Sequence, residues 1–64
     1  MIKHIELDQV QDPVYPDRTI SDLHMDGDKI QVAFLSEEGV DLVPLEDLTA
    51  DQLRALVRSL ALTR

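Results

Sequence analysis

The chain has 64 residues, a formal net charge of -7 and no cysteine. A domain of this size buries only about 60% of the surface that its unfolded chain exposes, so its margin of stability is thin. Small domains usually depend on disulfides, a metal or a partner subunit, and the absence of cysteine excludes disulfides and thiolate metal sites. We therefore expect a single domain over residues 1–64 that is stabilised by a protein partner, most simply a second copy of itself.

The charge balance also bears on partners and location. Thirteen Asp and Glu against six Lys and Arg disfavour direct binding of nucleic-acid phosphates. No apolar run reaches the roughly 18 residues that a membrane span needs, and the start MIKHIELDQ lacks the apolar core of a signal peptide. We predict no direct nucleic-acid binding, no membrane insertion and a cytoplasmic location, in a protein whose short length suits bacterial or phage origin.

The predicted elements form an α+β domain. Partial alternation predicts a short N-terminal strand over residues 1–7. Residues 8–18 are expected to be a loop, because Pro13 and Pro16 each remove a backbone donor. Residues 19–43 predict a three-stranded antiparallel β-meander, and residues 49–62 predict a C-terminal α-helix that packs on one face of this sheet.

The first hairpin of the meander is centred on Asp26-Gly27. A two-residue turn of this kind needs positive φ at its central positions, which Gly accepts freely. Centring the turn there sets Ile20 opposite Ala33, on the face that also holds the polar residues. Because opposite residues in an antiparallel ladder share a face, the other face gathers Leu23, Met25, Ile30, Val32 and Phe34.

Gly39 closes the second hairpin. A three-residue turn over residues 37–39, with Gly39 at positive φ, places Leu42 opposite Phe34. A four-residue loop over residues 36–39 would instead place Asp41 opposite Phe34. The first arrangement keeps the core face apolar, so the sequence predicts the Phe34–Leu42 pair.

The start of the helix has the clearest local signature in the chain. Thr49 precedes Gln52 by three residues, which is the spacing of a capping box, and Leu48 and Leu53 match the two positions of a hydrophobic staple. Apolar residues then repeat at positions i, i+3, i+4 and i+7. The stripe that we expect to pack on the sheet is Leu53, Leu56, Val57 and Leu60.

No constellation of residues indicates catalysis. His4 and His24 lie on different predicted strands, and no third metal ligand converges on them. Asp26-Gly27-Asp28 lacks the residue order of a calcium loop, and no Ser has a nearby His to activate it. We therefore predict a protein without enzymatic activity, cofactor or bound metal.

An apolar row on the sheet face away from the helix is the first candidate for function. A single sheet that leaves such a row in water would gain stability from a partner. An alternative is that the N-terminal strand folds over part of the row. The sequence therefore predicts a non-enzymatic interaction or assembly module that self-associates through the outer sheet face, using Ile20, Ala33, Leu35 and Val43.

The acidic residues of the meander suggest an alternative function. A small rigid acidic domain can imitate the phosphate spacing of nucleic acid and occupy a basic site on another protein. The chain would then be an acidic inhibitor or nucleic-acid mimic, encoded by a phage or mobile element. Its contact residues would be Asp22, Asp26, Asp28, Glu37, Glu38 and Asp41.

Overall fold

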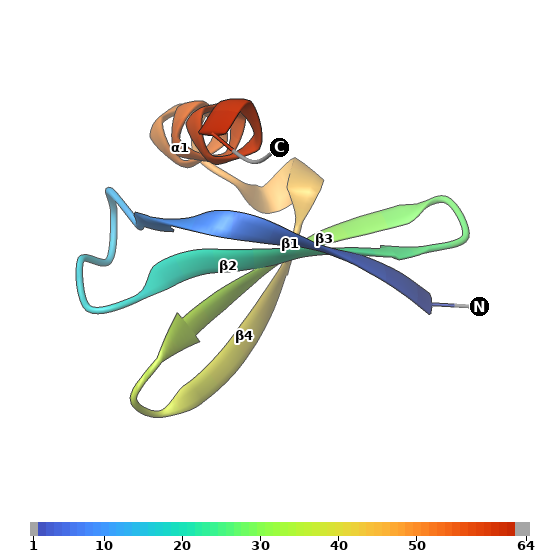
Figure 1. The fold of residues 1–64 in the computed structure, drawn as a ribbon, viewed down its shortest axis with the longest axis horizontal. Helices are drawn as coiled ribbons and strands as arrows, with labels where there is room; N and C mark the ends of the chain where they lie inside the picture. Colours follow the sequence, from blue (N-terminus) through green and yellow to red (C-terminus); the bar gives the residue numbers. More distant parts are fainter. Residues whose placement is uncertain (1, 63–64) are drawn as a thin grey trace.

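The computed structural model describes residues 2–62 and has a four-stranded antiparallel sheet with one helix packed against it (Figure 1). The strands pair in the order in which they occur along the chain, so the predicted α+β meander with a C-terminal helix is confirmed. The elements are β1 (Ile2–Gln11), β2 (Thr19–Asp26), β3 (Lys29–Ser36), β4 (Gly39–Pro44), the 3₁₀ helix η1 (Leu45–Asp47) and α1 (Ala50–Leu62).

The first strand is longer than predicted and belongs to the sheet. β1 continues to Gln11, past the predicted end at residue 7, and pairs with β2 on both sides of an irregularity between Glu6 and Val10. The connecting loop is therefore limited to residues 12–18. Because β1 is an edge strand of the same sheet, it does not fold over the outer face, which rules out the alternative placement of this strand.

The turn of the first hairpin lies one residue later than predicted. Asp26 pairs with Lys29, so the turn residues are Gly27 and Asp28, and Gly27 has a φ of 62°. A turn that needs positive φ at its first central position favours Gly there, which accounts for the shift. Each partner moves by two positions, so side chains near the turn keep their predicted face: Leu23, Met25, Ile30 and Val32.

An irregularity at Ser21 reverses the side on which Ile20 lies. The ladder passes from the pair Asp22–Ala33 to the pair Ile20–Phe34, and Ser21 is skipped between them. An extra residue in one strand turns the side chains beyond it to the opposite face. Ile20 therefore joins Phe34 in the core, where the two are 0% and 1% exposed. The prediction that Ile20 lies on the outer face is wrong.

The second hairpin has a two-residue turn. Ser36 pairs with Gly39, and Phe34 pairs with Asp41. The predicted pairing of Phe34 with Leu42 is therefore wrong. The physical reason is that Asp41 does not need to avoid the apolar face, since Arg18 covers the Phe34 ring and binds the Asp41 carboxylate.

The same register decides which way the last strand faces. Leu42 pairs with Ala33 and lies on the outer face, whereas Val43 pairs with Val32, which is fully buried. Val43 is partly buried against the core cluster. The prediction that Val43 lies on the outer face is therefore also wrong.

Helix α1 begins as predicted but packs with a different stripe. The Thr49 N–H donates to Gln52 Oε1 (3.0 Å), and the Gln52 N–H donates to Thr49 Oγ1 (3.1 Å), which confirms the capping box. The buried residues of α1 are Gln52, Leu56 and Ser59, so only Leu56 of the predicted stripe is buried. The other three residues of that stripe are exposed: Leu53 by 38%, Val57 by 63% and Leu60 by 42%.

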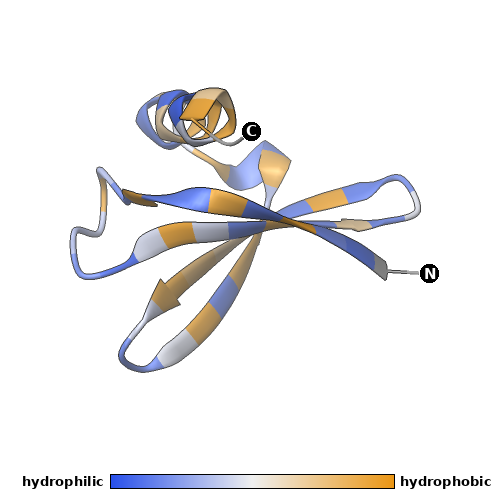
Figure 2. Cartoon of the chain, viewed as in Figure 1, coloured by the Kyte–Doolittle hydropathy of each residue, from blue (hydrophilic) through white to orange (hydrophobic). Residues whose placement is uncertain are grey.

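The core lies between α1 and the adjoining half of the sheet. Polar and apolar residues alternate along the strands, as an amphipathic sheet requires (Figure 2). No helix within residues 2–62 is long and apolar enough to cross a membrane. The residues of the core cluster are Leu7, Ile20, Val32, Phe34, Leu48 and Leu56.

Candidate interaction surfaces

A buried polar cluster joins the loop over residues 12–18 to the start of α1. Asp12 is 0% exposed and accepts hydrogen bonds from Arg18 Nε (2.7 Å) and from the Val14 N–H (2.9 Å). The Gln52 amide also donates to the two carboxylate oxygens of Asp12, at 3.2 and 3.3 Å. Gln52 thus caps the helix and binds the loop at the same time, so this cluster sets where α1 sits on the sheet.

Arg18 closes one end of the core. Its guanidinium carbon lies 4.3 Å from the centroid of the Phe34 ring and 4.6 Å from that of Tyr15, distances at which a cation is attracted to an aromatic face. Arg18 Nη1 also lies 3.2 Å from Asp41 Oδ2. No motif in the sequence points to Arg18 and Asp12, for which the only signal is an acid and a base on either side of a segment with two prolines.

Acid pH is expected to weaken the Asp12 cluster. Burial raises the pKa of Asp12, but hydrogen bonds from Arg18, Val14 and Gln52 lower it by more, so the pKa of this carboxyl lies below its ordinary value of 3.8. Such a group stabilises the fold above its ordinary pKa, and the contribution is lost as pH falls through the folded-state pKa.

The matched variant for this prediction is Asp12→Asn, which cannot ionise at that position. The difference in unfolding free energy between the wild type and Asp12→Asn should be constant near neutral pH and shrink below pH 3.8. Urea unfolding at a series of pH values measures it. A difference that stays constant down to about pH 2 would show that the Asp12 charge contributes nothing to stability.

The outer sheet face carries only part of the predicted contact surface. Ala33 and Leu35 lie there, although Ala33 is just 1% exposed. Ile20 and Val43 lie on the opposite face, toward α1. Their place on the outer face is taken by Val40 and by Leu42, which the sequence predicts on the core face. The exposed residues that we call the outer patch are Leu35 (39%), Val40 (59%) and Leu42 (46%).

The six predicted acidic residues do not form one surface. The β2–β3 turn carries Asp26 and Asp28, whereas the β3–β4 turn carries Glu37 and Glu38. The two turns lie at opposite ends of the sheet (Figure 1), and an eight-residue strand separates them by about 26 Å. Asp41 is engaged in its ion pair at the edge of the core. Four of the six acids are thus divided between two distant turns, and Asp22 lies within β2, opposite Ala33.

The two histidines are brought together across the outer face. His4 pairs with His24 between β1 and β2, with ring centroids 5.8 Å apart, and the next pair on this face is Glu6 with Asp22. Among residues 2–62, however, no group of three or more His, Cys, Asp or Glu side chains is arranged to hold a metal ion. We therefore assign no ligand to this pair.

Helix α1 leaves an apolar ridge exposed beside the core. The residues of this α1 ridge are Leu53, Val57 and Leu60. The ridge is exposed because the stripe that faces the sheet contains two polar residues with fixed partners: Gln52 binds Asp12, and the Ser59 hydroxyl donates to the backbone carbonyl of Asp8. These hydrogen bonds fix the rotation of the helix about its axis and turn the ridge away from the core.

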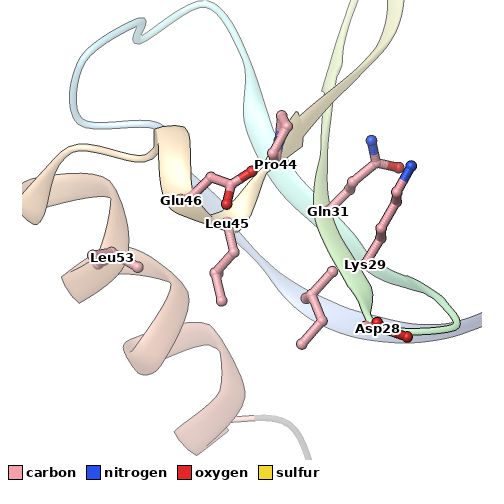
Figure 3. A pocket seen from close by; sticks show the side chains of 8 residues that line it. Asp28, Lys29, Gln31, Pro44, Leu45, Glu46 and Leu53 are labelled. Atoms are coloured by element: carbon pink, nitrogen blue, oxygen red, sulfur yellow. The ribbon is translucent and has the colours of Figure 1, made fainter.

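A groove of about 640 Å³ lies next to the α1 ridge, between α1, η1 and the β2–β3 hairpin (Figure 3). Its apolar lining includes Ile30, Leu45 and Leu53. Leu45 points into the space between the helix and the hairpin, and the carboxylates of Asp28 and Glu46 lie at the edges (Figure 3). The groove is therefore an apolar hollow whose lining also carries charges of both signs, from Asp28, Glu46 and Lys29.

Comparisons of the chain with protein-family models, with curated proteins and with solved structures give no match.

The candidate sites are the two exposed apolar surfaces on opposite faces of the sheet. One is the outer patch, and the other is the groove together with the α1 ridge.

Proposed function

We propose that this chain is a non-enzymatic interaction module that self-associates. The observation that carries this proposal is the α1 ridge, a row of three large apolar side chains that the fold itself leaves in contact with water. Burying a large aliphatic side chain contributes roughly 1.5–3 kcal/mol, and these side chains are about half exposed. Covering the ridge would supply stability that a domain of this size otherwise lacks.

The outer sheet face remains a second surface for the same function. This face is apolar even though Ile20 and Val43 lie on the other side of the sheet, because Val40 and Leu42 join Leu35 there. Self-association through this face is the contact that the sequence predicts. Both surfaces support the same proposed partner, which is a second copy of the chain.

The buried polar residues support a non-catalytic role. Asp12, Gln52 and Ser59 each hold two elements of the fold together. Each is closed off from solvent, so a substrate would not reach it without local unfolding. The acidic-inhibitor alternative has less support, because its residues are divided between two ends of the sheet. We further propose a cytoplasmic location, which the absence of cysteine supports.

Thermal unfolding at several protein concentrations tests self-association. Unfolding of an associated form releases free chains, so mass action makes its midpoint depend on concentration. For a domain of this length we expect Tm to rise by about 5–10 °C over a hundredfold increase in concentration. A Tm that is the same at all concentrations would contradict the proposed function.

A further inference from the structure

We infer that the open edge of β4 binds an extended basic segment of another protein, which adds to the sheet as an antiparallel strand. β4 is the last strand in the sheet order, so its outer edge has no neighbouring strand within residues 2–62. Addition of a strand at such an edge is a recurrent way of recognising peptides. The inference goes beyond the proposed self-association, because the partner is a different chain and the surface is the β4 edge rather than the α1 ridge.

The register shows which backbone groups of β4 point to this edge. Gly39 pairs with Ser36 directly after the two-residue turn, and hydrogen-bonded and non-hydrogen-bonded pairs then alternate along the strand. The N–H and C=O groups of Val40 and Leu42 therefore point outward, away from β3. Within residues 2–62 no hydrogen bond from outside the sheet ladder reaches them. Pro44 stands at the next outward position, where the ladder loses no donor to a residue without an N–H.

β4 lacks the protection that the other edge of the sheet has. Soluble proteins protect edge strands by irregular pairing or by covering them. The pairing of β1 is irregular between Glu6 and Val10, and α1 packs against this strand. β4 pairs without a break over its six residues, and Val40 and Leu42 are 59% and 46% exposed. An added strand would cover these two side chains and satisfy their backbone groups.

The charges around β4 favour a basic segment rather than a second copy of the chain. Acids outnumber bases at both ends of the strand. The charged residues at the first end are Asp17, Glu37, Glu38, Asp41 and Arg18. Those at the second end are Asp28, Glu46, Asp47 and Lys29. Antiparallel pairing of two β4 strands would bring the two acidic ends together, so this edge repels its own copy.

A hollow of about 330 Å³ beside β4 is placed to take a basic side chain. Its lining includes the acids Asp17, Glu38 and Asp41, together with Arg18. Arg18 does not reverse the charge of the hollow, because it binds the buried Asp12 carboxylate at 2.7 Å and Asp41 at 3.2 Å. A lysine of the added strand opposite Asp41 would face these carboxylates, while its neighbours in the strand would lie on the apolar outer face. The segment that fits therefore alternates apolar and basic residues.

Three capped hexapeptides test the added strand on the wild type. In the first, valine and lysine alternate; the other two are the same peptide N-methylated at every valine or at every lysine. In antiparallel pairing the valine amides face β4 and the lysine amides face away. Valine methylation should therefore weaken binding by at least about tenfold, and lysine methylation by less than about threefold. NMR titration measures both, and the amide resonances of Val40 and Leu42 should move while that of Val57 on α1 should not.

Two substitutions at one position separate the backbone of β4 from its side chain. Leu42→Pro removes an outward N–H and, like Pro44, takes no donor from the ladder with β3. We expect it to weaken binding of the unmethylated peptide by about tenfold. Leu42→Val keeps the N–H and should change binding by less than about threefold. Circular dichroism shows whether both variants are folded, and the methylated peptides test the same hydrogen bonds without any substitution.

A second matched pair tests the position of the basic side chain. Glu38→Lys and Asp26→Lys change the net charge equally, but Glu38 borders the hollow, whereas Asp26 is exposed at the distant β2–β3 turn. Screening at physiological salt acts over about 8 Å. Glu38→Lys should therefore weaken binding of the lysine peptide by at least about fivefold, and Asp26→Lys by less than about twofold.

The outcomes that would overturn the inference are distinct. Equal binding of the three peptides would show attraction by charge without strand addition. Equal effects of the two lysine substitutions would mean that no basic side chain lies in the hollow. A peptide with glutamate in place of lysine that binds as tightly would overturn the basic partner, as would the absence of binding at about 1 mM lysine peptide. None of these results bears on self-association, which the concentration dependence of Tm tests separately.

Discussion

Replacing Asp12 by Ala is expected to remove most of the stability of the fold. The change leaves Arg18, whose side chain is only 14% exposed, without its buried carboxylate partner, and it also removes the acceptor of the Gln52 amide. Breaking a buried ion pair by removing one partner costs about 3–5 kcal/mol. A domain of this length has roughly 3–10 kcal/mol in total. Urea unfolding followed by circular dichroism should show a greatly lowered midpoint or no cooperative transition.

Asp17 provides the control for this prediction. It lies in the same loop and is exposed, so Asp17→Ala removes the same charge without disturbing a buried contact. Its effect on the free energy of unfolding should stay within about 0.5 kcal/mol. Equal effects of the two substitutions would mean that the Asp12 cluster does not hold α1 to the sheet.

Ile20→Ala and Leu35→Ala should differ strongly, although the sequence predicts the same outer face for both residues. Ile20 is 0% exposed beneath α1, so its truncation should cost about 2–5 kcal/mol through lost burial and a cavity. Leu35 is 39% exposed in the outer patch, and its truncation should cost less than about 1 kcal/mol. Chemical unfolding of both variants at one low protein concentration measures the difference.

Low concentration matters for this comparison because association would add its own contribution at Leu35. Equal losses of unfolding free energy in the two variants would contradict the irregularity at Ser21 and would place Ile20 on the outer face. The measurement therefore tests the corrected register independently of any partner.

Local signals in the sequence predict which elements form. The capping box of Thr49 and Gln52 depends on side chains three residues apart, and the β2–β3 turn depends on the conformational freedom of Gly27. Both are short-range effects that a pattern of residues specifies. They suffice for the order of the elements and for the α+β class.

The faces of those elements depend on contacts between distant residues, and there the sequence misleads. Preference for an apolar neighbour of Phe34 predicts Leu42, yet Asp41 takes that position because Arg18 lies between the carboxylate and the ring. Likewise, one skipped residue at Ser21 moves Ile20 into the core. Neither effect leaves a periodic trace in the sequence.

The rotation of α1 has the same kind of origin. Apolar periodicity alone turns Val57 toward the sheet, but hydrogen bonds from Gln52 to Asp12 and from Ser59 to the backbone of Asp8 hold the helix in another orientation. Two polar residues in the buried stripe thus outweigh the apolar pattern. The α1 ridge is exposed because of this rotation. Apolar periodicity alone buries these side chains, so the sequence predicts an exposed apolar surface only on the opposite face of the sheet.

Self-association is tested most directly by sedimentation equilibrium of the wild type. The weight-average mass should rise from the monomer value of 7.2 kDa toward twice that value as concentration increases from about 1 to 300 μM, the range expected of a small interface. A mass that remains 7.2 kDa throughout this range would contradict the account.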